Sequence, residues 1–132
     1  MRLAVIGCGS ISQVYLRNLT ASPEVEVVAC ADIFPERAEA RAAEFGVGRA
    51  YSPAELLADP EIDLVVNLTI PAAHFEISRA ALLQGKHLWS EKPLAVDREQ
   101  GAILVREASV GGLLLGCAPD TVLGAGDSNV SE

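Results

Sequence analysis

The chain has 132 residues, of which 50% are hydrophobic, and a formal net charge of −8 at pH 7. This length suits one domain, and ten scattered Lys and Arg residues argue against general nucleic-acid binding, which needs clustered positive charge. No apolar run approaches the roughly 20 residues of a membrane span, and the first apolar run starts too early for a secretory signal. We therefore expect a cytoplasmic protein with no nucleic-acid or membrane partner.

The first apolar run, residues 3–6, predicts a buried strand, and two glycines, Gly7 and Gly9, follow it. Apolar residues at helical spacing follow, and they predict a helix whose buried face carries Ile11, Val14, Tyr15 and Leu19. A loop with almost no side chains lets a pyrophosphate approach the free N–H groups at a helix start. Gly7 would make the tight turn and Gly9 the close approach, while Ser12 replaces the third glycine of G-x-G-x-x-G.

A second apolar, β-branched run, residues 25–31, ends at Asp32. A dinucleotide-binding fold places at this spacing the acid that binds the adenosine ribose hydroxyls, although Asp32 could instead cap the helix that starts near Pro35. A carboxylate there repels a ribose 2′-phosphate, which favours NAD over NADP. The nearby Arg37 keeps NADP open as the cofactor.

The rest of the chain alternates helices and strands. Helices are expected at residues 35–45, 53–59, 71–84 and 97–111, and strands at 49–51, 63–68, 87–89 and 113–116. A capping box of Ser52 and Glu55 starts the second of these helices. The charged residues of the first, including Arg41, read as a solvated face.

Such alternation predicts an α/β fold with a doubly wound parallel sheet, the Rossmann fold, in a single domain. We expect the dinucleotide-binding domain to cover residues 1–118. Residues 119–132 read as a loop and a polar tail, expected to be disordered.

Ligands of such a sheet bind outside the carboxyl ends of its strands. Lys92 is the one cation expected there, and it could meet a substrate oxygen near the nicotinamide, or simply pair with Glu91. His74 could contact ribose or substrate, or be a capping or surface residue, whereas His87 reads as structural. Trp89 reads as a core residue, with stacking on the cofactor as the alternative. The three cysteines and two histidines match no common metal spacing, so no metal is expected.

Several segments match a known family. These are Gly7-Cys-Gly-Ser-Ile11, Asp32, the run Tyr51-Ser-Pro-Ala-Glu-Leu-Leu, the run from Asp63 to His74, Glu91-Lys-Pro-Leu-Ala95 and Gly116-Cys-Ala-Pro-Asp-Thr121. Together they resemble the N-terminal half of the Gfo/Idh/MocA family of NAD(P)-dependent oxidoreductases, over residues 2 to about 124. Glu-Lys-Pro is the most specific of these motifs.

The resemblance implies an NAD- or NADP-binding Rossmann domain, followed in the family by a substrate domain that would begin near residue 119. It implies Lys92 as the active-site lysine, and as cofactor-lining residues Gly7, Gly9, Ser10, Ile11, Asp32, Thr69, Pro71, His74 and Glu91. Substrates in the family are mostly sugars, inositols and related secondary alcohols. Without the second domain the chain is expected to be truncated, to bind dinucleotide without turning over alone, and to self-associate through uncovered apolar surface.

Two other functions fit part of the sequence. A non-catalytic nucleotide-binding or dimerising module would use the same fold for sensing or scaffolding. A methyltransferase that binds S-adenosylmethionine shares the glycine loop and the acid after the second strand, but it leaves Glu91-Lys92-Pro93 unexplained.

Overall fold

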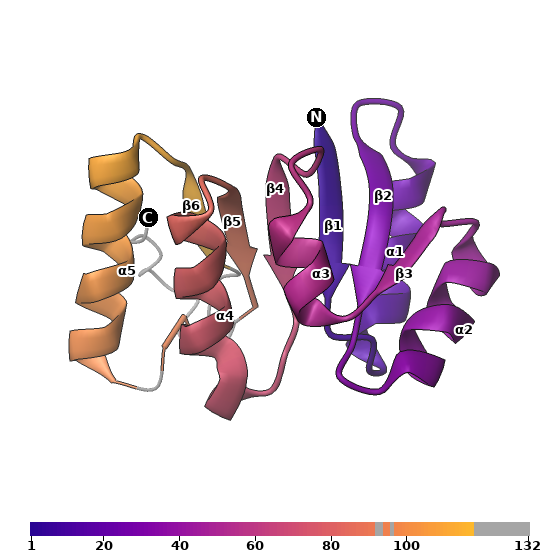
Figure 1. Ribbon diagram of the computed structural model, residues 1–132, viewed down its shortest axis with the longest axis horizontal. Helices are drawn as coiled ribbons and strands as arrows, with labels where there is room; N and C mark the ends of the chain where they lie inside the picture. Colours follow the sequence, from indigo (N-terminus) through magenta and orange to yellow (C-terminus); the bar gives the residue numbers. More distant parts are fainter. Residues whose placement is uncertain (92–93, 96, 118–132) are drawn as a thin grey trace, which may run out of the picture.

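The computed structural model describes residues 1–91, 94–95 and 97–117. Its strands are β1 (Arg2–Ile6), β2 (Glu26–Ala31), β3 (Arg49–Tyr51), β4 (Leu64–Asn67), β5 (His87–Ser90) and β6 (Leu115–Cys117). Its helices are α1 (Ile11–Ala21), α2 (Pro35–Phe45), α3 (Pro53–Ala58), α4 (Pro71–Leu83) and α5 (Arg98–Gly111). All strand pairs are parallel, in the order β3-β2-β1-β4-β5-β6 (Figure 1). The predicted doubly wound Rossmann sheet is therefore confirmed.

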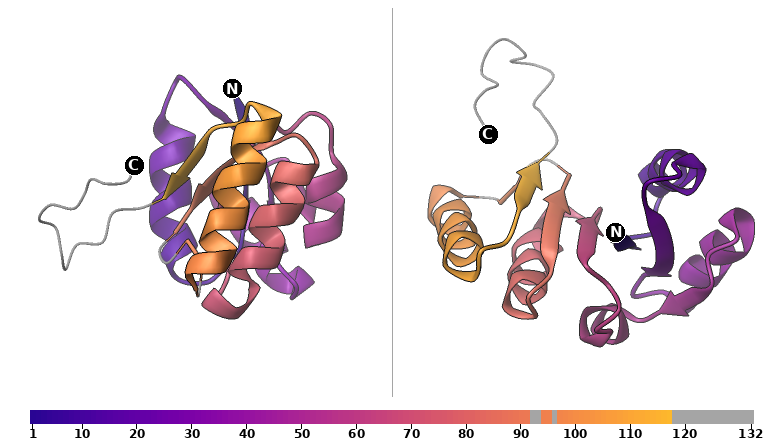
Figure 2. Two further views of the ribbon diagram at one scale, coloured as in Figure 1. Left: turned by 90° about the vertical axis from the view of Figure 1, so that its left-hand side faces the viewer. Right: turned by 90° about the horizontal axis from the view of Figure 1, so that it is seen from above.

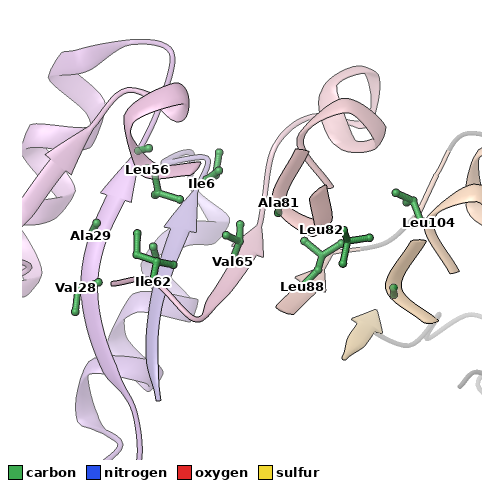
Figure 3. Packing of buried hydrophobic residues seen from close by; sticks show 13 residues of the cluster. Ile6, Val28, Ala29, Leu56, Ile62, Val65, Ala81, Leu82, Leu88 and Leu104 are labelled. Atoms are coloured by element: carbon green, nitrogen blue, oxygen red, sulfur yellow. The ribbon is translucent and has the colours of Figure 1, made fainter. Parts of the chain in front are cut away.

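Helices cover both faces of the sheet, with α1 and α2 on one side and α3, α4 and α5 on the other (Figure 2). The side chains of β1 alternate between these layers, as expected of a strand buried on both faces. Leu3 and Val5 pack with the α1 and α2 layer, whereas Ala4 and Ile6 pack with the other. Figure 3 shows the second cluster, in which Ile6 and Val65 lie near Leu56 and Leu88.

The start of α3 matches its sequence signature. The Ser52 hydroxyl accepts a hydrogen bond from the Glu55 N–H at 3.2 Å, and the Glu55 carboxylate accepts one from the Ser52 N–H at 2.8 Å. These reciprocal bonds satisfy amides that lack partners in the first helical turn, so the predicted capping box is confirmed.

The predicted buried face of α1 is wrong in part. Ser12 and Leu16 are buried, whereas Ile11 and Val14 are 42% and 52% exposed. A small residue at position 12 lets the start of the helix approach the sheet closely, and this turns the larger neighbours outward. Strand β6 also begins two residues later than expected.

The predicted tail, residues 119–132, lies outside the described residues. Within the described part of the chain, no helix is long and apolar enough to cross a membrane.

Candidate functional site

The turn after β1 packs against the ends of β2 and β4, the strands on either side of β1. Gly7 has φ +102°, and a Cβ there would lie 2.7 Å from the carbonyl carbon and oxygen of Leu68. Its N–H donates to the Ala31 carbonyl at 2.8 Å. Only glycine fits this position, because any side chain would clash with backbone and the positive φ would strain it.

Gly9 has a different environment. A Cβ at Gly9 would meet no heavy atom within 4 Å, so the space beside this residue is open. Helix α1 starts directly after it, with Ser10 as N-cap. Among the described residues no side chain caps this end and no acid lies in its first turn. The partial positive charge of the helix start is therefore left for an anion from outside.

Asp32, directly after β2, connects the glycine turn to the neighbouring strand. Its Oδ1 accepts a hydrogen bond from the Cys8 N–H and its Oδ2 one from the Phe34 N–H, both at 2.9 Å. The N-cap of α2 is Phe34, so the alternative that Asp32 caps this helix is wrong. Each carboxylate oxygen keeps a second lone pair, which leaves Asp32 able to accept from a hydroxyl group.

Arg41 of α2 does not belong to a solvated face, as the sequence suggested. Its side chain is 19% exposed, and its Nε donates to the Ser12 Oγ at 3.0 Å. Its Nη2 donates to the Gly9 carbonyl at 3.3 Å, and the Ser12 hydroxyl donates to the same carbonyl at 2.6 Å. The serine at the third glycine position thus joins the loop to a guanidinium group on the next helix.

Asn67, the last residue of β4, organises the next part of this edge. Its side chain is fully buried, and its Nδ2 donates to the His74 carbonyl at 3.1 Å and to the Ser78 Oγ at 2.9 Å. Its Oδ1 accepts from the N–H and the hydroxyl of Thr69, at 3.1 and 2.6 Å. The amide thereby makes all four hydrogen bonds of which it is capable. These bonds fix the loop from β4 into α4.

Tyr15 connects α1 to the residues that follow β5. Its hydroxyl donates to the Glu91 Oε2 at 2.5 Å and accepts from the Trp89 Nε1 at 3.3 Å. Burial and the adjacent Glu91 carboxylate raise the pKa of Tyr15, which keeps the phenol protonated as a donor. The Glu91 N–H in turn donates to the Asn67 carbonyl at 3.1 Å. Helix α1, β4 and the end of β5 are thus joined by hydrogen bonds.

Two buried cysteines lie close to this site, Cys8 within the glycine turn and Cys30 in β2. The Cys8 Sγ donates to the Ala31 carbonyl at 3.3 Å, and the Cys30 Sγ donates to the Ala38 carbonyl at 3.4 Å. The neighbouring Cys30 thiol and burial raise the pKa of Cys8. A neutral, buried thiol is a poor nucleophile, so the Cys8 side chain serves packing.

The topology places the predicted cofactor residues at one edge of the sheet, because they all follow the carboxyl ends of parallel strands. Gly7, Gly9, Ser10 and Ile11 follow β1, Asp32 follows β2, Thr69, Pro71 and His74 follow β4, and Glu91 follows β5. The His74 side chain is only 2% exposed, which excludes a surface role, and Ile70, not His74, is the N-cap of α4. Lys92 lies outside the described residues.

The remaining residues that had been assigned a role lie elsewhere. His87 is at the opposite edge of the sheet, where its Nδ1 accepts from the Leu114 N–H at 3.0 Å. Within the described ranges, no group of three His, Cys, Asp or Glu could hold a metal. Sequence reasoning missed Tyr15, Asn67 and Arg41, since each acts through partners that no local motif marks.

The chain is similar to proteins of known family. The family model GFO_IDH_MocA, described as an oxidoreductase family with an NAD-binding Rossmann fold, matches residues 1–117. A 1,5-anhydro-D-fructose reductase of Ensifer adhaerens is 34% identical over 116 residues, which cover 87% of this chain and 35% of that protein. A scyllo-inositol 2-dehydrogenase (NAD(+)) of Bacillus subtilis strain 168 is 34% identical, over 76% of this chain and 30% of that protein.

Solved structures of oxidoreductases also match this chain. The 3-ketoreductase KijD10 of Actinomadura kijaniata, crystallised in an open conformation with TDP-benzene and NADP, superposes with a TM-score of 0.85 at 36% identity. The match covers 89% of this chain and 37% of that one. The chain thus spans about a third of the length of the relatives that it matches.

Proposed function

Because the chain belongs to the Gfo/Idh/MocA oxidoreductase family and is an NAD-binding Rossmann domain, we propose how it holds the cofactor. The site lies at the carboxyl ends of the parallel strands, which we call the carboxyl edge of the sheet. The pyrophosphate lies over Gly9 at the start of α1, and Asp32 accepts hydrogen bonds from the adenosine ribose. The nicotinamide half then extends across β1 toward β4 and β5. The observation that carries this proposal is the open space beside Gly9, next to an uncapped helix start and one strand away from a carboxylate.

The cofactor we propose is NAD, with NADP as the weaker ligand. The Asp32 carboxylate would lie against the 2′ position of the adenosine ribose and would repel a phosphate there. Arg37, the nearby cation that could offset this repulsion, is stacked over the Phe34 ring with its guanidinium carbon 4.7 Å from the ring centroid. This contact keeps the Arg37 guanidinium beside the Phe34 ring.

The reaction we propose is hydride transfer between the nicotinamide and a secondary alcohol or ketone of a sugar or inositol. Relatives described as a scyllo-inositol 2-dehydrogenase and a 3-ketoreductase support this class of substrate. By its position directly after Glu91, Lys92 would exchange the proton with the alcohol oxygen.

We further propose that these 132 residues bind the dinucleotide without turning over a sugar alone. A dehydrogenase must hold the substrate within near-attack distance of the nicotinamide. The family members compared above are about three times as long as this chain, so substrate-holding residues have room outside the matched part.

A titration with NADH, NADPH and S-adenosylmethionine tests the proposal, with Trp89 and reduced-nicotinamide fluorescence as signals. We expect binding of NADH, weaker binding of NADPH and none of S-adenosylmethionine. Binding of S-adenosylmethionine alone would refute the oxidoreductase assignment. A panel of sugars and inositols with NAD then tests turnover, and oxidation of any of them by the chain alone contradicts the non-catalytic part of the proposal.

A further inference from the structure

The carboxyl edge contains a hydrogen-bonded chain that the glycine motif does not explain. It runs from the Trp89 indole to the Tyr15 hydroxyl and on to the Glu91 carboxylate. Tyr15 and Glu91 are 76 positions apart in the sequence, so this contact joins the helix that follows the glycine turn to the end of β5.

The hydrogen bond between Tyr15 and Glu91 is expected to be stable. A phenol that donates to a carboxylate forms a charge-assisted hydrogen bond, roughly twice as strong as a bond between neutral groups. Burial and the Glu91 carboxylate raise the pKa of Tyr15, so the phenol acts as a neutral donor in this contact. The Trp89 Nε1 and the backbone bond from Glu91 to Asn67 hold the two ends from either side.

Its position also separates it from the adenosine side. In the strand order β3-β2-β1-β4-β5-β6, Asp32 lies one strand to one side of β1, and Glu91 follows the second strand on the other side. A dinucleotide whose ribose is held at Asp32 and whose pyrophosphate lies over β1 reaches the β4 and β5 side with its nicotinamide half.

We propose that Tyr15 is a positioning residue for the nicotinamide half of the cofactor and acts by fixing the Glu91 carboxylate. This inference rests on the proposed function. The adenosine half does not depend on Tyr15, because Asp32 and the glycine turn are held by their own bonds to Cys8, Phe34 and Ala31.

Tyr15→Phe tests this, because it removes the hydroxyl and keeps the ring. The readout is the affinity for NADH and for ADP, which lacks the nicotinamide riboside, both measured by calorimetry. We expect NADH to bind about tenfold more weakly, as for the loss of a hydrogen bond to a charged group, and ADP affinity to change less than about twofold.

Tyr51→Phe is the matched control, since the Tyr51 hydroxyl also donates to a carboxylate, Asp59 Oδ2, at 2.9 Å. It should leave both affinities unchanged. Glu91→Gln should reproduce the selective loss of NADH affinity, and the double variant Tyr15→Phe with Glu91→Gln should be no weaker than the single ones.

Unchanged NADH affinity in Tyr15→Phe overturns the inference, as does an equal loss for NADH and ADP, which would mean a merely structural role. Additive losses in the double variant overturn it too. A wild-type chain that binds neither ligand instead overturns the proposed function, and this inference with it.

Discussion

The two halves of the carboxyl edge are built in different ways. On the β1 and β2 side, the turn is held through its backbone: Gly7 packs against Leu68, the Cys8 N–H donates to Asp32, and the Gly9 carbonyl accepts from Arg41. On the β4 and β5 side, the loops are held by side chains that bond to one another, chiefly Asn67 and Tyr15. The first half therefore depends on the shape of a glycine turn and on bonds to its backbone. The second depends on bonds between side chains, both within one loop, as between Asn67 and Thr69, and between distant segments, as between Tyr15 and Glu91.

Gly7→Ala should have the largest effect on stability. The new methyl group would lie 2.7 Å from the Leu68 backbone, and φ is +102°, so the end of β4 or the turn must move. We expect a loss of about 3 kcal/mol or more in the free energy of unfolding, measured with urea. Gly9→Val is the contrasting variant, because its Cβ would meet nothing within 4 Å. It should keep nearly full stability and lose NADH binding, and equal destabilisation by both variants would contradict the distinction between the two glycines.

Asn67→Leu should damage the other half. It removes all four side-chain hydrogen bonds and leaves partners such as the Ser78 hydroxyl and the Thr69 N–H without them. We expect a loss of about 2 to 4 kcal/mol in unfolding free energy. The same change at the exposed Asn18 should cost less than about 0.5 kcal/mol. Comparable losses at the two positions would show that the buried network adds little.

Asp32→Asn should weaken NADH binding by about 1.5 to 3 kcal/mol, since the ribose loses a charged acceptor. It should weaken NADPH binding less, because the charge that repels the 2′-phosphate is gone. Stability should also fall, by about 1 kcal/mol, as one of the two N–H donors loses its acceptor. Calorimetric titration of both cofactors measures the ratio, and an unchanged ratio would mean that Asp32 only holds the turn.

Arg41→Met should have the smallest effect. The variant keeps much of the apolar stem and loses the bonds to the Ser12 hydroxyl and the Gly9 carbonyl. We expect about 1 kcal/mol lower stability and a small loss of NADH affinity. Arg17→Met, on the exposed surface of α1, should change neither, and urea unfolding with NADH titration compares the two.

What the sequence could predict depends on whether the contacts of a residue are local in the sequence. The alternation of elements, the glycine turn and Asp32 follow from local spacing, and the parallel sheet places them without further information. Tyr15 was expected only as an apolar residue on a helix face, because its partner Glu91 comes near in space only after four further strands have formed. Arg41 was misassigned for the same reason, since its charge alone suggested solvent. The role of Lys92 stays a prediction.

The serine at position 12 has an electrostatic consequence for the turn. A peptide oxygen without a partner near the proposed diphosphate position would repel the anion, and the Gly9 carbonyl belongs to this turn. That oxygen is occupied by three donors, the Ser12 N–H at 3.1 Å, the Ser12 hydroxyl and the Arg41 guanidinium. The negative end of this peptide dipole is thus bonded within the fold, which would lower its repulsion of the diphosphate that we propose for this turn of a chain with a net charge of −8.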